Sequence, residues 1–292
     1  MTAPAAGPVV VGVDRGAAAA DALALGRWAA ELLEVPLTVA VVHPAPSALG
    51  SGRVDAEWIA DRHRVAEEVL AGARSTLGDP PGAEYRTIAS SSAAHGLHDL
   101  AEQVHASLLV VGSSASGPAA RLFAGSTAER LLAGSPCPVA IAPAGMPNEP
   151  GAVGRIGVAY VDTPDGRAAL TEAARLARRT GSPLLLVTVV ARGDAAVPFL
   201  LGDDAERAFL DTARETYEEA LRKAAECVPD VRVEWELRSG DVVETLAELG
   251  EVDVLFCGSR GYGPTRRVLL GGVSTRLLRR ACRPLVVVPR AA

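Results

Sequence analysis

Short apolar runs alternate with longer amphipathic segments along the whole chain. The runs at 37–42 and 184–189 consist of Leu, Val, Thr and Ala. Segments 21–33 and 205–227 are rich in Ala, Leu, Glu and Arg at helical spacing. Apolar runs without strict alternation are typical of strands that are covered on both faces. Because crossovers between parallel strands are right-handed, the pattern predicts an α/β fold with a doubly wound, mostly parallel sheet.

This succession of elements occurs twice. The apolar runs at 108–112 and 254–258 are each followed by a stretch of small residues, and the two runs are offset by 146 positions. Near the start of each copy, Leu23 corresponds to Leu170 at an offset of 147. Similarity at a fixed offset indicates tandem copies of one domain. We expect two tandem doubly wound domains, each with a five-stranded sheet in the order 3-2-1-4-5 and helices on both faces.

The two copies meet in a proline-rich connection. Segment 143–151 contains three prolines, which cannot donate ladder hydrogen bonds, and its composition suits an exposed link. The sequence therefore predicts domain 1 at 1–147 and domain 2 at 148–292.

Candidate binding residues follow the first and fourth strands. In open α/β sheets, ligands bind outside the carboxyl ends of the strands, where the strand order reverses. Asp14 follows the first strand, and Gly112 and Gly258 each follow a fourth strand. The second copy has the pattern Gly-x2-Gly-x9-Gly at Gly258, Gly261 and Gly271. Such glycines let backbone N–H groups surround an anion, which favours phosphate binding; ordinary turn chemistry is the alternative.

The composition of the chain excludes several classes of binding partner. The formal charge of −6 and the lack of clustered basic residues argue against nucleic acid. The single lysine, Lys223, excludes a Walker A loop. No apolar run approaches the ~20 residues of a spanning helix, and the N-terminus lacks the features of a leader. We expect no membrane partner and a cytoplasmic location.

The cysteines and histidines do not form a recognisable catalytic or metal pattern. Cys137, Cys227, Cys257 and Cys282 show no C-x-x-C spacing, so we expect buried, reduced thiols. All five histidines lie in the first copy, and no G-x-S-x-G elbow is present. The sequence predicts neither a metal site nor an enzyme, with a thiol enzyme that uses Cys257 or Cys282 as a remote alternative.

Taken together, the first-strand Asp, the glycine pattern and a final strand of Cys-Pro-Val type resemble the universal stress protein family over nearly all of both copies. The resemblance implies a stress-response protein that binds adenine nucleotide (ATP, with or without Mg²⁺) reversibly, without well-defined catalysis. It also implies that two domains pair through their last strands, so that the tandem copies form an internal pseudo-dimer, and it leaves a homodimer open.

The resemblance also assigns site residues by position. Asp14 would lie beside adenine, the ends of the second strands would offer backbone contacts, and the glycine loops with the following helix starts would hold phosphate. The assigned residues are Asp14, Val42, Gly112, Gly125, Ser126, Thr127, Val189, Gly258, Ser259, Arg260, Gly261, Gly271, Gly272, Val273 and Ser274.

Each copy departs from the family pattern in a different way. Ala115 replaces the second glycine and Arg15 the glycine after Asp14. In the second copy Val161 stands where the Asp is expected, the acid follows at Asp162, and Gly272 replaces Ser or Thr. These departures do not show which of the two sites would bind nucleotide more tightly. They favour, as the alternative function, a degenerate scaffold that binds no nucleotide and presents its pseudo-dimer surface to protein partners.

Overall fold

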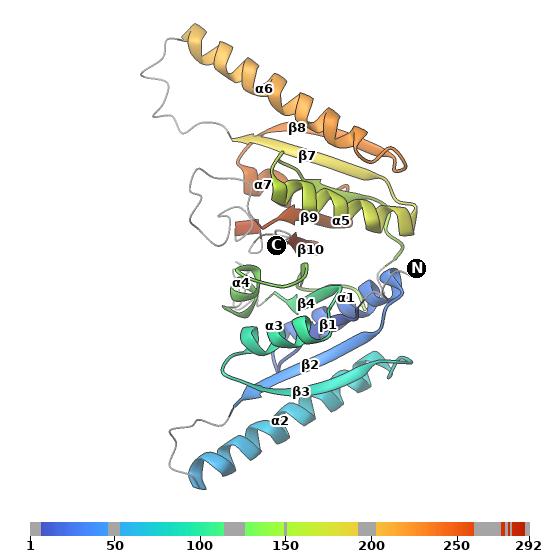
Figure 1. Ribbon diagram of the computed structural model, residues 1–292, viewed down its shortest axis with the longest axis vertical. Helices are drawn as coiled ribbons and strands as arrows, with labels where there is room; N and C mark the ends of the chain where they lie inside the picture. Colours follow the sequence, from blue (N-terminus) through green and yellow to red (C-terminus); the bar gives the residue numbers. More distant parts are fainter. Residues whose placement is uncertain are drawn as a thin grey trace. The chain divides into compact units, whose positions relative to one another are not determined.

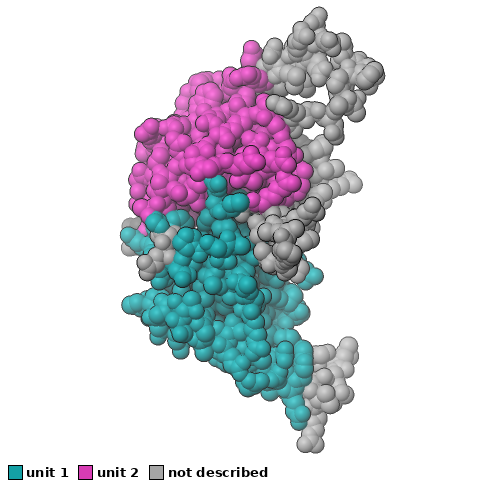
Figure 2. Space-filling model, turned by 180° about the vertical axis from the view of Figure 1, so that it is seen from behind, with its two compact units in different colours: residues 1–151, 282–289 teal, residues 152–281, 290–292 magenta. Residues whose placement is uncertain are grey.

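The computed structural model describes residues 7–45, 53–113, 126–148, 151–191, 203–259, 276–277, 280 and 282–289. The chain divides into two compact units (Figure 2). Unit 1 comprises Met1–Gly151 with Cys282–Pro289, and unit 2 comprises Ala152–Ala281 with Arg290–Ala292.

The sheet of unit 1 has the predicted strand order. Its strands are β1 (Val9–Gly12), β2 (Leu37–Pro44), β3 (Glu84–Ser90), β4 (Leu108–Gly112), β5 (Val139–Ala142) and β10 (Leu285–Val288). The first five are parallel neighbours in the order β3-β2-β1-β4-β5, and β10 pairs antiparallel with β5. Val11 of β1 is aligned with Val39 and Val110, and all three are fully buried.

Helices cover both faces of this sheet (Figure 1). They are α1 (Ala18–Leu33), α2 (Arg53–Leu77), α3 (Ala93–Gln103) and α4 (Ser126–Leu132). Helix α1 packs against α2, and α3 packs against α4. Successive strand residues point to opposite faces: a Cβ on Gly26 of α1 would lie 2.1 Å from the Val11 side chain, whereas one on Gly12 would lie 2.5 Å from Leu97 of α3. The sheet of unit 1 is therefore doubly wound.

Unit 2 repeats most of this plan. Its strands are β6 (Ile156–Ala159), β7 (Leu184–Ala191), β8 (Val233–Gly240) and β9 (Val254–Gly258), all parallel in the order β8-β7-β6-β9. Its helices are α5 (Pro164–Thr180), α6 (Asp203–Glu226) and α7 (Val242–Ala247). Helix α5 packs on β6 and β9, and α6 and α7 pack on β7 and β8.

These observations confirm the predicted fold class and the tandem organisation. The fifth strand of the second copy, β10, lies within unit 1. The division at 147 and 148 stays a prediction. The proline-rich connection is held against α1, because Met146 N–H donates to Asp21 Oδ1 at 2.9 Å and Trp28 Nε1–H donates to the Gly151 carbonyl at 3.1 Å. Among the described helices, none is long and apolar enough to cross a membrane.

Candidate functional site

The carboxyl ends of β1 and β4 meet the start of α1 in unit 1. The two strands are parallel neighbours, with Gly12 aligned to Val111. A Cβ on Gly112 would lie 2.4 Å from the carbonyl oxygen of Ala18 and 2.6 Å from its Cβ. Only glycine permits this approach without a shift of the backbone. The end of β4 is thus held against the turn that carries Asp14, as the strand order predicted.

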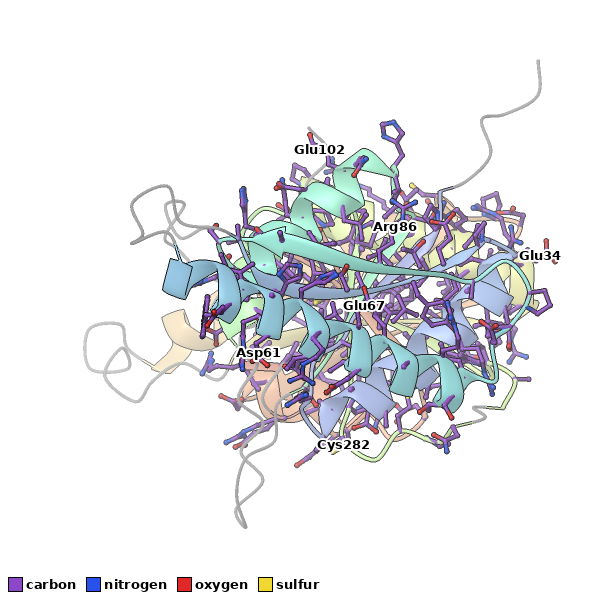
Figure 3. All side chains as sticks on the ribbon, turned by 90° about the horizontal axis from the view of Figure 1, so that it is seen from below. Glu34, Asp61, Glu67, Arg86, Glu102 and Cys282 are labelled. Atoms are coloured by element: carbon purple, nitrogen blue, oxygen red, sulfur yellow. The ribbon has the colours of Figure 1, made fainter. Side chains whose placement is uncertain are left out.

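Asp14 lies on the exposed turn between β1 and α1. Its Oδ1 accepts a hydrogen bond from Gly16 N–H at 2.7 Å, which closes an Asx turn. Among the described residues, no ion pair involves this carboxylate. The neighbouring Arg15 donates to Glu68 Oε2 of α2 at 2.8 Å. Glu67, the residue directly before Glu68 on α2, faces β3 (Figure 3) and accepts a hydrogen bond from Thr87 at 3.3 Å.

Ser113, directly after β4, is a candidate that the sequence did not single out. The residue is 2 % exposed, and its Oγ has no hydrogen-bond partner among the described residues. Its backbone N–H donates to the Ala142 carbonyl at 3.0 Å. A buried hydroxyl without a partner is costly. The signal that could have found it was the 146-residue offset, which matches Ser113 to Ser259.

In unit 2 the equivalent serine has a partner. Ser259 Oγ donates to Asp165 Oδ1 at 3.0 Å, and both residues are 6 % exposed. Asp165 lies in the first turn of α5. A Cβ on Gly258 would lie 2.8 Å from the Asp165 backbone, so the end of β9 meets α5 as β4 meets α1. The strand ends are alike in outline and differ in their polar contacts.

The turn between β6 and α5 is tightly folded. Val161, at the position expected for an adenine-side Asp, accepts a hydrogen bond at its carbonyl from Thr163 N–H at 2.7 Å. Thr163 Oγ1 caps α5 by accepting from Gly166 N–H at 3.1 Å. A Cβ on Gly166 would lie 2.0 Å from the Val161 carbonyl oxygen. The backbone of this turn is therefore already engaged.

Asp162, the acid that follows Val161, is engaged as well. It accepts hydrogen bonds from Arg167 Nε at 2.7 Å and from the Tyr160 hydroxyl at 3.2 Å. The hydrogen bond from Arg167 is the main cause that lowers the pKa of Asp162. Burial, followed by the charge of Asp162, raises the pKa of Tyr160 to about 12. Asp162 is thus exposed like Asp14, but it differs from Asp14 because it is held in an ion pair with Arg167.

Some of the other assigned residues lie in the described part of the chain, and the rest lie outside it. Val42 and Val189 lie near the ends of β2 and β7, aligned with Ile88 and Arg238, and Val189 is buried; their roles beside adenine stay predictions. Ser126 and Thr127 open α4. Outside the described residues lie Gly125, Arg260, Gly261, Gly271, Gly272, Val273 and Ser274. Ala115, which replaces the second glycine of the first copy, also lies outside them.

The thiols are not all buried. Cys137 and Cys257 are buried, but Cys227 and Cys282 are exposed, so the expectation of four buried thiols was wrong. Apolar patterning placed Cys257 in a strand, whereas Cys227 follows the end of α6 and Cys282 precedes β10. Burial raises the pKa of the Cys137 thiol to about 11, which makes it a poor nucleophile.

The profile of the universal stress protein family matches residues 6–143 and 153–289. The chain belongs to this family. Universal stress proteins of Mycobacterium tuberculosis and Mycobacterium bovis are each 32% identical to it over 296 residues, covering 96% of this chain and 99% of theirs.

Solved universal stress proteins share the fold. The crystal structure of one from Archaeoglobus fulgidus aligns with a TM-score of 0.67 and 20% identity, over 98% of this chain and 97% of that one. A putative universal stress protein from Pseudomonas aeruginosa aligns with a TM-score of 0.62 and 14% identity, over 96% of this chain and 91% of that one. The family membership thus agrees with the doubly wound tandem architecture.

Proposed function

We propose that this universal stress protein binds adenine nucleotide (ATP, with or without Mg²⁺) reversibly at the strand ends of unit 1, without catalysing a defined reaction. One observation carries the proposal: the exposed carboxylate of Asp14 and the hydroxyl of Ser113, which is buried without a partner among the described residues, follow adjacent parallel strands at the same edge of the sheet. Edges of this kind are the usual ligand sites of open α/β sheets.

The two groups suit different parts of a nucleotide. A carboxylate accepts hydrogen bonds, so Asp14 is suited to ribose hydroxyls or to the amino group of adenine. The Ser113 hydroxyl can donate to a phosphate oxygen, and a hydrogen bond to a charged acceptor is stronger than one between neutral groups. Such a bond would also remove the cost of leaving this hydroxyl buried without a partner.

The proposal extends to how the repeats are joined. Strand β10 of the second repeat pairs antiparallel with β5 of the first, with Val286 aligned to Ala140. This pairing supports an internal pseudo-dimer through the last strands. A homodimer, a cytoplasmic location and the lack of catalysis stay predictions.

Unit 2 favours the second candidate function, a scaffold that binds no nucleotide and offers its surface to protein partners. Its strand-end acids are bonded within the unit, Asp165 to Ser259 and Asp162 to Arg167. If unit 1 also fails to bind nucleotide, the scaffold function is the better account of the whole chain.

Calorimetric titration of the full-length chain with Mg-ATP tests the nucleotide proposal. We expect saturable binding that weakens about tenfold in Asp14→Asn and in Ser113→Ala, the loss expected for one hydrogen bond to a charged group. Asn at position 14 can still accept the bond from Gly16 N–H and preserve the turn.

Matched controls come from the amino ends of the strands. The first control is Asp79→Asn. Asp79 precedes β3 and has a φ of 50°, a conformation that Asn tolerates. The second control is Ser107→Ala. Ser107 precedes β4, and the substitution removes the hydrogen bond from its hydroxyl to the Gly7 carbonyl. Both should bind Mg-ATP as the parent chain does. No heat at millimolar Mg-ATP in the parent chain would overturn the proposal and favour the scaffold.

A further inference from the structure

The two units carry different residues at one position beside the end of the fourth strand. In unit 1, Gly112 is in contact with Ala18, and in unit 2, Gly258 is in contact with Asp165. Both contacted residues lie in the first turn of the helix after the first strand, at an offset of 147. Unit 2 thus has a carboxylate where unit 1 has a methyl group.

The carboxylate of Asp165 is well accommodated in the folded unit 2. Its Oδ1 accepts the hydrogen bond from Ser259 Oγ at 3.0 Å, and it lies at the N-terminus of the 17-residue helix α5, whose dipole favours negative charge. This helix end is also capped by Thr163. Unit 2 therefore supplies its own anion to the site, together with the hydroxyl that would otherwise meet a ligand.

Unit 1 lacks that anion. The Ala18 side chain offers no acceptor to Ser113, whose Oγ is buried without a described partner. The N-cap residue of the 16-residue helix α1 is Ala17, which makes no side-chain cap bond. The first-turn acid, Asp21, accepts a hydrogen bond from Met146 N–H. Within the described part of unit 1, a hydroxyl and a helix N-terminus are thus left for an external anion.

We propose that Asp165 is a specificity-determining residue that excludes polyphosphates from the strand ends of unit 2, so that the chain binds one nucleotide, in unit 1. Two effects act together. A phosphate near Asp165 meets a like charge in a poorly solvated site, where repulsion is stronger than in water. It would also have to take the Ser259 hydroxyl from Asp165 and leave a buried carboxylate without its partner. The inference rests on the proposed nucleotide binding.

Exchange of the residues between the units tests the inference, with Mg-ATP as the probe. Calorimetry of the full-length chain should give one site per chain for the parent and two for Asp165→Ala. Ala18→Asp should weaken binding in unit 1 at least tenfold (~1.4 kcal/mol). The double variant Asp165→Ala with Ala18→Asp should bind one Mg-ATP, in unit 2. Adding Ser259→Ala should weaken this binding further, whereas adding Ser113→Ala should not.

Uncharged variants separate charge from shape. Asp165→Asn keeps an acceptor for Ser259 but removes the charge, and we expect it to bind a second Mg-ATP. Ala18→Asn has the bulk of Asp without its charge, and it should lose less affinity than Ala18→Asp. Circular dichroism establishes whether each variant is folded. Adenosine, which has no phosphate, should distinguish little between the parent and Asp165→Asn.

The outcomes separate this inference from the proposed function. Two sites in the parent chain, or one site in both Asp165→Ala and Asp165→Asn, would overturn the role of Asp165 and leave nucleotide binding in place. No binding in the parent but one site in the Asp165 variants would overturn the site in unit 1 and support the exclusion by Asp165. No binding in any chain would overturn both.

Discussion

The turn after β1 and the turn after β6 occupy equivalent places in the two units, but their polar groups are engaged differently. In unit 1, Asp14 bonds to its own turn and Ser113 has no described partner. In unit 2, Asp162 is bonded to Arg167, and Ser259 to Asp165. The order of the first four strands of each repeat and the glycine at the end of the fourth strand are the same. A few residues in the first helical turn therefore decide whether polar groups remain for a ligand.

The difference also illustrates a trade between stability and binding. Satisfied polar groups stabilise the fold, whereas an unpartnered buried hydroxyl is costly until a ligand bonds to it. Among the described residues, unit 1 has such a hydroxyl at Ser113, which is expected of a binding site, whereas the equivalent hydroxyl of Ser259 in unit 2 is bonded to Asp165. The following three predictions test this comparison, from the largest expected effect to the smallest.

The largest difference should arise at the position where unit 2 has a closely packed glycine, Gly166, and unit 1 has Ala19. Gly166→Ala places a Cβ 2.0 Å from the Val161 carbonyl oxygen, so the turn has to shift, and we expect a loss of about 3 kcal/mol in the free energy of unfolding. The equivalent residue of unit 1 is already Ala19, and Ala19→Gly should cost only about 1 kcal/mol, through helix propensity.

Urea unfolding and hydrogen exchange measured on peptides from each unit check this prediction. The loss in Gly166→Ala should appear in peptides of unit 2. Equal losses for the two substitutions would mean that the turn after β6 is no tighter than the turn after β1.

The same substitution at the equivalent serines should have different effects on stability. Ser259→Ala leaves the Asp165 carboxylate buried without its partner and should cost about 2 kcal/mol of unfolding free energy. Ser113→Ala removes a hydroxyl that has no described partner, so its effect should stay within about 0.5 kcal/mol of zero. Urea denaturation of both variants without nucleotide measures the difference. A cost of similar size for Ser113→Ala would show that this hydroxyl has a partner in solution.

Much of the fold could be predicted from the sequence because it depends on local patterns. Continuous apolar runs gave the buried parallel strands, the offset of 146 or 147 gave the two repeats, and Gly112 and Gly258 were placed correctly at strand ends. The expected helix at 21–33 lies within α1, and the one at 205–227 overlaps α6. Periodicity and repeat spacing are sufficient for such assignments.

The polar contacts could not be predicted, because they join residues that are distant along the chain. Asp165 has the sequence position of an ordinary acid in a first helical turn, and its burial depends on Gly258 and Ser259 more than 90 residues later. Similarly, Ser113 is bonded through its backbone N–H to Ala142 of β5, 29 residues later. Cys227 and Cys282, which lie near the end of a helix or strand, are exposed. The apolar character of cysteine therefore does not suffice to predict whether a thiol at such a position is buried.

The smallest predicted effect concerns acid pH and the Asp162–Arg167 pair. The hydrogen bond from Arg167 lowers the pKa of Asp162 below its ordinary value of 3.8. Because the folded pKa is the lower one, the pair stabilises unit 2 fully above about pH 3.8, and this stabilisation is lost as the pH falls through the folded pKa. Both side chains are substantially exposed, so solvent screening should limit the effect to less than about 1 kcal/mol.

Urea unfolding of the parent chain and Asp162→Asn between neutral and acid pH measures this contribution. The parent should be the more stable at neutral pH, and the two curves should converge below the folded pKa. The substitution should also lower the pKa of Tyr160, since the charge of Asp162 contributes to its value of about 12. Parallel curves with an unchanged Tyr160 titration would mean that the pair is open in solution, and the contrast between the turns of the two units would then rest on Asp165 and Ser259.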